Sequence, residues 1–229
     1  MQIKGVKMER FEYIKNDKEI IEIYEKISQK EDTEKGGAHH DIRHVLNVAN
    51  LVEKLLRDLN YDDEFIEEAK IAAILHDVGC VDGKEGHPER SFNFSKEYIE
   101  RKNINLKYKE DVLEAIKNHS SGFDTNNIIT LTLILSDKLD VKYTRITSAG
   151  RNIVGNRQFL HIQDIKLEIK DNILKVNFIT DNNLDLKELE EYYFIEKIFK
   201  AIKAFSDKMN FTPKVLLDEK RWNKFYESI

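Results

Sequence analysis

Apolar residues recur at helical spacing through the first 150 residues of the chain, and this periodicity constrains the fold more than any other feature. The spacing predicts helices over Glu19–Lys30, Asp41–Leu59, Asp63–Val78, Pro88–Arg101, Lys109–His119 and Ile128–Ile146. The last of these is the most apolar stretch of the protein, so we expect it to be the central buried helix. Only two prolines occur in 229 residues, which also favours a mainly α protein.

The pattern changes near Gly150, where strands are predicted for the first time. Apolar residues alternate over Ile165–Ile169 and again over Leu174–Phe178, which predicts a β-hairpin. A long amphipathic helix is predicted from about Leu186 to Met209, and a short apolar run, Val215–Leu217, follows it. We therefore expect an N-terminal helical segment over residues 1–35, a helical domain over residues 36–150 and a small α+β appendage over residues 151–229.

The composition indicates an ordered, soluble, cytoplasmic protein. The net charge of −5 argues against a dedicated nucleic-acid binder, because phosphate backbones are normally met by a basic surface. No apolar run reaches the roughly 18 residues of a membrane-spanning helix. The first twenty residues carry acids and lysines where a signal peptide is apolar. The single cysteine, Cys80, excludes an intrachain disulfide, fits a reducing compartment and is expected to be a small buried residue.

Several ionisable side chains fall on the apolar faces of predicted helices. His44 shares a face with Val48 and Val52, and His76 and His119 follow apolar residues in the same manner. One such histidine would commonly be an ordinary hydrogen-bonded core residue. Four imidazoles and two carboxylates together instead predict a metal site, because a metal binds neutral imidazole and ionised carboxylate. The candidate ligands are His44, His76, Asp77, His87, His119 and Asp137.

Asp137 follows a run over Ile128–Leu135 that contains only isoleucine, leucine and threonine. A carboxylate at the end of such a run is costly unless a cation meets it, and a metal would supply that charge. We therefore expect Asp137→Ala to leave the metal-free protein at least as stable as wild type. The same substitution should remove the stabilisation that metal binding provides.

The order of these residues resembles the signature of the HD superfamily of metal-dependent phosphohydrolases. The resemblance lies in HDIRHVLNVA, ILHDVG and LILSDKLD and covers about residues 36–150. Further histidines in GHPERS and IKNHSSG are similar to the subset of the superfamily that holds a second metal. The stretch from AIKNHSSG to LSDKLD resembles the bacterial dinucleoside tetraphosphatase branch. Asn47 stands where that branch often has arginine, which leaves the substrate open.

The resemblance implies an HD-domain helical bundle with two divalent metal ions, iron or manganese, with zinc as an alternative. It implies hydrolysis of a phosphate ester or anhydride, such as that of a nucleotide, by a hydroxide held at the metals. It assigns His44, His76, Asp77 and Asp137 to the first metal and His87 and His119 to the second, with Asp77 as the bridging catalytic residue.

Basic residues near the candidate ligands provide candidate contacts for a phosphorylated substrate. Lys138 and Arg145 are seven positions apart, so we expect them on one face of the Ile128–Ile146 helix, and Lys138 is also a catalytic candidate. Lys84 and Arg90 flank His87. Each of these four could equally be an ordinary surface cation.

Other residues leave alternatives open. We expect His39 to be exposed in a loop, whereas His40 could be a substrate contact or a further ligand. The aromatic residues Tyr192, Phe194, Phe199 and Phe205 are expected to form the appendage core or an oligomer surface, such as that of a homodimer, rather than a base-stacking platform.

Two rival functions also remain. Some HD proteins with the same six ligands resemble mixed-valent di-iron oxygenases, and the chain could also be a non-catalytic nucleotide-binding or sensory module. The ligands alone do not separate the oxygenase from the hydrolase, whereas activity on phosphate esters without oxygen would favour the hydrolase. We rank the binding module last, because degenerate domains usually lose ligands and none is missing from this sequence.

Overall fold

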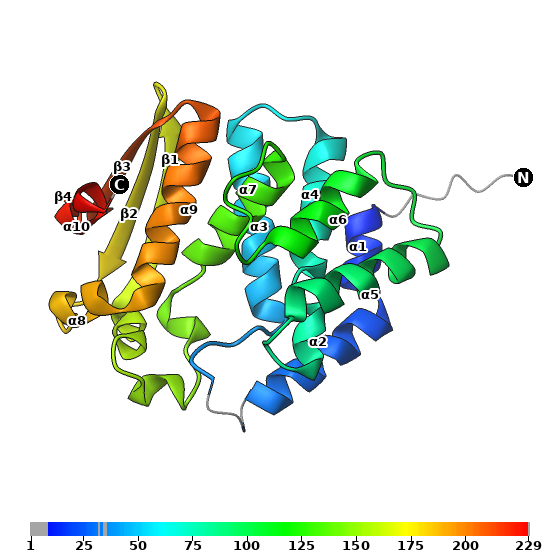
Figure 1. Cartoon of the computed structure of the whole chain (residues 1–229), viewed down its shortest axis with the longest axis horizontal. Coiled ribbons are helices and arrows are strands. Elements are labelled where there is room, and N and C mark those ends of the chain that lie inside the picture. Colours follow the sequence, from blue (N-terminus) through cyan, green and yellow to red (C-terminus); the bar gives the residue numbers. More distant parts are fainter. Residues whose placement is uncertain (1–8, 32, 34–35, 229) are drawn as a thin grey trace, which may run out of the picture.

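The computed structural model describes residues 9–31, 33 and 36–228, and shows a helical part beside a small sheet covered by a helix (Figure 1). The helices of the first part are α1 Arg10–Lys15, α2 Lys18–Glu31, α3 Ile42–Asp58, α4 Asp63–Leu75, η1 Val78–Asp82, α5 His87–Arg101, α6 Lys109–Asn118 and α7 Ile128–Leu139. The expected mainly α fold with a small α+β appendage is confirmed. Within the described residues no helix is long and apolar enough to cross a membrane.

Short polar side chains fix where several of these helices begin. Asp41, Asp62 and Asn127 are N-cap residues of α3, α4 and α7, and each side chain accepts a hydrogen bond from a backbone N–H in the first turn. The Asp41 cap bonds the N–H of His44, with 3.0 Å between nitrogen and oxygen. A candidate ligand is therefore held in the first turn of α3.

Helix α7 lies at the centre of the molecule and is buried over Ile129–Leu139. It packs against α3, α4 and α6 on one side and against α9 (Tyr193–Met209) on the other. The helical part has its own apolar core, to which α1 and α2 contribute, and a second core joins α7 to the appendage. A helix this apolar is stable here because it is covered on all sides.

The expected central helix Ile128–Ile146 is too long. It ends at Leu139, because Asp140 leaves the helical conformation (φ −85°, ψ 64°) and its side chain binds His44. The chain then turns through η2 (Tyr143–Arg145), and Ile146 pairs with Ala38 in an isolated β-bridge. This turn brings residues after α7 beside the segment that precedes α3.

The appendage contains a four-stranded sheet in the order β1-β2-β3-β4. Its elements are η3 Gly150–Asn152, η4 Asn156–His161, β1 Ile162–Lys170, β2 Ile173–Thr180, α8 Leu186–Glu191, α9, β3 Thr212–Leu217, β4 Lys220–Arg221 and α10 Asn223–Glu227. The predicted hairpin is β1-β2, and its turn residues Asp171 and Asn172 both have positive φ. Strand β3 is parallel to β2, so α8 and α9 form the crossover between them.

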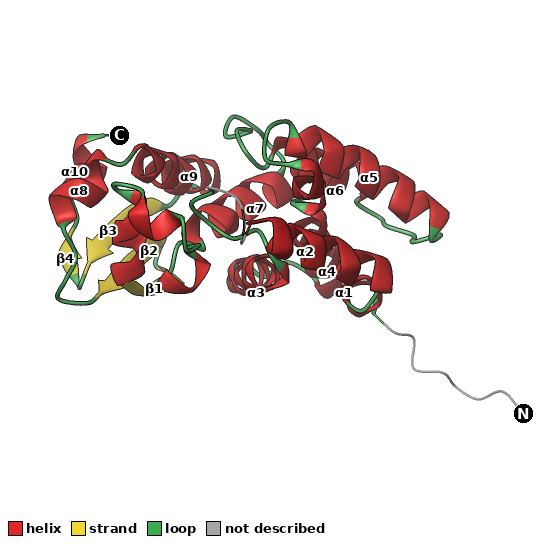
Figure 2. Ribbon diagram, turned by 90° about the horizontal axis from the view of Figure 1, so that it is seen from below, coloured by secondary structure: helices red, strands yellow, loops and turns green. Residues whose placement is uncertain are grey.

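The predicted helix Leu186–Met209 is also wrong in one respect, because it is two helices. Tyr192, between α8 and α9, has an extended backbone (φ −78°, ψ 122°). Tyr192 packs on Gly155, where an added Cβ would lie 2.5 Å from the Cβ of Tyr192. Helix α9 packs between the sheet and α7 and thereby joins the appendage to the helical part (Figure 2).

Candidate metal centre

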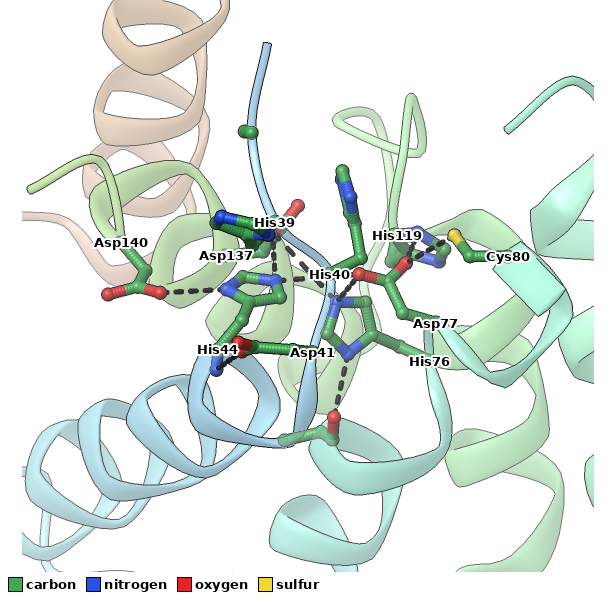
Figure 3. Close-up of polar contacts among 12 residues, drawn as sticks. His39, His40, Asp41, His44, His76, Asp77, Cys80, His119, Asp137 and Asp140 are labelled. Atoms are coloured by element: carbon green, nitrogen blue, oxygen red, sulfur yellow. Dashed lines mark hydrogen bonds and ion pairs between the residues drawn. The ribbon is translucent and has the colours of Figure 1, made fainter. Parts of the chain in front are cut away.

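All six side chains that the sequence suggested as metal ligands meet in one buried site. Figure 3 shows His44, His76, Asp77, His119 and Asp137 in this site. The six side chains come from five helical segments: His44 from α3, His76 and Asp77 from the end of α4, His87 from the start of α5, His119 from the end of α6 and Asp137 from α7. His76 and His119 are the C-cap residues of their helices. Each candidate ligand therefore lies in the first or last turn of a helix or directly after its end.

Asp77 lies between two pairs of histidines. One of its oxygens, Oδ2, is 3.4 Å from Nε2 of His44 and 3.1 Å from Nε2 of His76. The other, Oδ1, is 3.3 Å from Nε2 of His87 and 3.4 Å from Nε2 of His119. Two groups of potential ligand atoms, each spanning no more than 4.8 Å, therefore share this carboxylate.

Asp137 lies next to the first pair. Its Oδ1 is 3.2 Å from Nε2 of His44 and 3.9 Å from Nε2 of His76. The same carboxylate contacts two cations, because Lys138 Nζ bonds Oδ2 and Arg145 Nη2 is 3.5 Å from Oδ1. The stability expected for metal-free Asp137→Ala assumed a carboxylate that no cation meets without metal, and that assumption is wrong. Two cations of the chain itself already meet it.

Each histidine is held through Nδ1, which leaves Nε2 directed into the site. The oxygens near Nδ1 are Asp140 Oδ2 at 2.7 Å for His44, Ala73 O at 2.6 Å for His76, Lys84 O at 2.6 Å for His87 and Ile116 O at 2.8 Å for His119. Carbonyl and carboxylate oxygens only accept, so Nδ1 carries a proton in each ring, and Nε2 carries the lone pair whenever the ring is neutral. Among the described residues, the buried Nε2 atoms of His44 and His76 have no hydrogen-bond partner. Such atoms fit metal ligands well.

The charges of the site favour a cation at its centre. Burial and the nearby Arg145 lower the pKa of His44, but the surrounding carboxylates of Asp137, Asp140 and Asp77 outweigh them and raise it to about 10. Burial alone would raise the pKa of Asp77 and of Asp137. The interactions of Asp77 with the neighbouring histidines, and those of Asp137 with Lys138, His44 and Arg145, nevertheless hold both pKa values well below the usual range. A proton on His44 thus occupies the position that a metal ion would take.

Asp140 is a functional residue that the sequence analysis missed. Its Oδ2 binds Nδ1 of His44 and its Oδ1 accepts from Nδ2 of Asn47, at 3.3 Å. A carboxylate behind a ligand histidine orients the ring and makes it a better ligand. The spacing of Asp140, three residues after Asp137, was a signal that could have found it. Asn47 does not line the main cavity, and its role is to hold Asp140 in place through this hydrogen bond.

A cavity of about 240 Å³ opens beside the candidate metal centre. On one side it is lined by Asp77, His87, His119 and Asp137, together with the basic residues Lys84, Lys138 and Arg145. On the other side it is lined by residues of the appendage: Asn156, Phe159, Tyr192, Tyr193, Phe194 and Lys197. The aromatic residues expected to form the appendage core are therefore divided. Phe199 and Phe205 are core residues, whereas Tyr192 and Phe194 line the cavity.

Lys138 and Arg145 do not share a helical face as expected, because α7 ends before Arg145. Both nevertheless reach Asp137, since the chain turns back at η2. Arg145 also donates to the backbone carbonyls of His39, Asp137 and Asp140. Its guanidinium therefore joins the end of α7 to the segment before α3 and has little capacity left for a ligand.

Arg90 has a similar bonding pattern but lies outside the cavity lining. Its guanidinium donates to the carbonyls of Gly79, Gly83 and Glu85, all in the loop between Asp77 and His87. This loop must be short and firmly held, because both of its ends carry candidate ligands. Arg90 is thus placed to position the loop rather than to meet a phosphate.

His40 and His39 precede the first candidate ligand and contact Glu31, which the sequence analysis did not single out. Both the backbone N–H and Nδ1 of His40 bind the Glu31 carboxylate, at 2.7 and 2.6 Å. Burial lowers the pKa of His40 well below its usual value, so it lines the cavity as a neutral ring. The expectation that His39 is exposed is wrong, since only 14% of its side chain is accessible.

Comparison with known protein families agrees with this geometry. Residues 41–148 match the HD domain family. The match includes all six candidate ligands and Asp140, whereas the appendage lies outside it. No curated protein sequence matches the chain. The helical part therefore contains an HD domain, a family commonly made up of metal-dependent phosphohydrolases, and its buried histidine and aspartate cluster fits a metal site.

Proposed function

We propose that this HD-domain protein is a metal-dependent phosphohydrolase that cleaves a phosphate ester or anhydride of a nucleotide. One observation carries the proposal. The two oxygens of the buried Asp77 carboxylate face two different pairs of histidine Nε2 atoms, at the wall of a cavity that also contains lysine side chains. Metal-assisted hydrolysis of a phosphate ester uses this combination of metal ligands and positive charge.

The donor set suits two divalent ions. Imidazole and carboxylate ligands together fit iron or manganese, and also zinc. We assign His44, His76, Asp77 and Asp137 to one ion and Asp77, His87 and His119 to the other, with Asp77 bridging. Ions bound there would lower the pKa of a water molecule and neutralise phosphoryl oxygens.

Other residues of the chain orient the ligand histidines and supply positive charge for the phosphate. Asp140 and the carbonyls behind the histidines hold the Nε2 atoms toward the centre. Lys138 and Lys84 line the cavity and are placed to bind the phosphate, with Lys138 also stabilising negative charge that develops on it. Arg145 and Arg90 hold backbone segments around the site. Water then adds to phosphorus as the bond from phosphorus to the leaving oxygen breaks, and a proton released by that water ends on the leaving oxygen.

The test combines metal analysis with a substrate screen. Protein purified without added ions is analysed for iron, manganese and zinc, and phosphate release from nucleotides and simpler phosphate esters is measured with added manganese or iron. We expect metal in the protein and hydrolysis without oxygen. Turnover that requires oxygen and releases no phosphate would favour the oxygenase instead, and binding of a nucleotide without turnover would favour a binding module.

The matched variants are Asp77→Asn and Asp82→Asn. We expect Asp77→Asn to lose at least about a thousandfold in kcat/KM, because one substitution weakens both groups of ligands, while circular dichroism shows an intact helical fold. Asp82 lies at the end of η1, outside the cavity lining, so Asp82→Asn should remain active. Full activity of Asp77→Asn would contradict the proposal.

A further inference from the structure

We propose that the appendage forms a substrate-recognition wall, and that its aromatic side chains bind the nucleobase of the substrate while the HD domain binds the phosphate. The aromatic wall consists of Phe159, Tyr192, Tyr193 and Phe194. The inference rests on the proposed function, because the phosphate is the part of the substrate placed at the candidate metal centre. It assigns a role to the appendage, which lies outside the family match.

The aromatic wall and the candidate ligands line the same cavity. Asp77 and Lys138 lie on the HD-domain side, and Tyr193 and Phe194 lie on the appendage side. The volume of about 240 Å³ lies just below the range of roughly 300–1,000 Å³ typical of ligand pockets. We therefore expect one small molecule, with its phosphate at one side and one ring at the other, rather than a substrate with two enclosed nucleosides.

The break between α8 and α9 creates the wall. Successive residues of an α-helix point about 100° apart, so three consecutive side chains of an unbroken helix cannot line one cavity. Tyr192 is extended and ends α8, and α9 begins at Tyr193. The three consecutive aromatic residues, Tyr192, Tyr193 and Phe194, therefore all line the cavity.

The wall is held in place by contacts at its base. Tyr192 packs closely on Gly155, whose φ of +80° is one that glycine adopts readily. The Tyr192 hydroxyl donates to Oδ1 of Asn156 at 3.3 Å. Nδ2 of Asn156 donates in turn to the carbonyls of Gly37 and Gly150, at 2.9 and 3.1 Å. A wall fixed before the ligand arrives loses less entropy on binding.

Two of the four rings of the wall remain available to a ligand, whereas Phe159 is buried in the core. Tyr193 is 61% exposed and Phe194 is half-buried, although both are large aromatic residues. Lys197 lines the same cavity, with its ammonium group 5.4 and 6.0 Å from the centres of these two rings. Aromatic rings beside a cation suit a planar base that is joined to an anionic phosphate, because stacking and charge act together.

The experiment separates ring binding from hydrolysis. Calorimetry with the manganese-loaded protein compares adenosine with ribose, neither of which has a phosphate to release. Hydrolysis assays compare adenosine 5′-monophosphate with ribose 5-phosphate, which lacks the base. We expect adenosine to bind much more tightly than ribose, and kcat/KM to be about 10-fold higher for the nucleotide.

The test variant is Tyr193→Leu and its control is Tyr13→Leu, an exposed tyrosine of α1 outside the cavity. We expect Tyr193→Leu to raise KM for the nucleotide by about 10-fold and to leave hydrolysis of ribose 5-phosphate unchanged. Phe194→Leu should act in the same direction. Tyr13→Leu should have no effect on either substrate.

The possible outcomes distinguish the two proposals. Equal hydrolysis of both esters, with no effect of Tyr193→Leu, would overturn the aromatic wall and leave the phosphohydrolase intact. Binding of adenosine that depends on Tyr193, without hydrolysis of any phosphate ester, would support the wall and refute the phosphohydrolase. Equal binding of adenosine and ribose would also overturn the wall.

Discussion

Replacing Asp137 with alanine tests how the charges of the candidate metal centre are balanced. In the structure its carboxylate contacts Lys138 Nζ and lies 3.5 Å from Arg145 Nη2. Both cations are buried, with exposed fractions of 6% and 7%. Alanine would leave these two charges without their carboxylate, so we expect the metal-free variant to be less stable than wild type.

Two opposing effects determine the magnitude. The substitution relieves the desolvation of a buried carboxylate, but it leaves two buried cations without their partner. Burial raises the pKa of Asp137, yet Lys138, His44 and Arg145 together hold it well below the usual range, so attraction exceeds desolvation. Removing one partner of a buried ion pair typically costs about 3–5 kcal/mol. We expect a loss of about 3 kcal/mol, because Arg145 keeps its carbonyl acceptors.

The assay is thermal unfolding followed by circular dichroism, with and without manganese. For a chain of 229 residues, a loss of 3 kcal/mol lowers the Tm by about 6–12 °C. The pKa of Asp137 is lowered in the folded protein. Its contribution to the free energy of unfolding is therefore present above the unfolded-state pKa of about 3.9 and disappears as the pH falls through the folded-state pKa. The difference between the two proteins should therefore narrow in acid.

Asp124→Ala, which removes an exposed aspartate outside the cavity lining, is the control. An unchanged or higher Tm of metal-free Asp137→Ala would refute this account of the buried cations. Manganese present at about 100 times its Kd should raise the free energy of unfolding of wild type by about 2.7 kcal/mol. The increase should be smaller for Asp137→Ala. An equal increase in both proteins would show that Asp137 is not a ligand.

Two further predictions concern the number of metals and their competition with protons. His119→Ala should reduce the bound metal from about two ions per chain to about one, measured by elemental analysis, and should lower activity by at least about 100-fold. His161→Ala is the control. Unchanged metal content in His119→Ala would show that His119 is a core residue and not a ligand. Since the pKa of His44 is about 10 without metal, metal binding near neutral pH should release about one proton from it. Calorimetry in two buffers of different ionisation enthalpy measures this release, and a metal affinity that does not rise with pH would contradict it.

The local sequence was sufficient for most of the helical part. The expected helix Asp41–Leu59 differs from α3 by one residue at each end, and Pro88–Arg101 differs from α5 by one residue at its start. The reason is that apolar periodicity and N-cap side chains are local signals. The same periodicity placed His44 and Asp137 on buried faces, because a polar residue on an apolar stripe is visible without the fold.

Contacts between distant segments decided where the longer predicted helices end. Apolar periodicity continues past Leu139, but α7 stops there because Asp140 binds His44, 96 positions earlier in the chain. Periodicity also continues through Tyr192, but the helix breaks there because Tyr192 packs on Gly155. Neither partner is a neighbour in the sequence, so no local pattern could reveal the break.

The sequence by itself determined the mainly α fold and the residue types that a metal site needs. The family resemblance already implied that Asp77 bridges two groups of ligands, but only the tertiary structure showed that Lys138 and Arg145 meet Asp137. It also showed that the appendage closes one side of the cavity with Tyr192, Tyr193 and Phe194. The physical reason is that periodicity records which face of an element is buried, whereas a site depends on which buried faces meet.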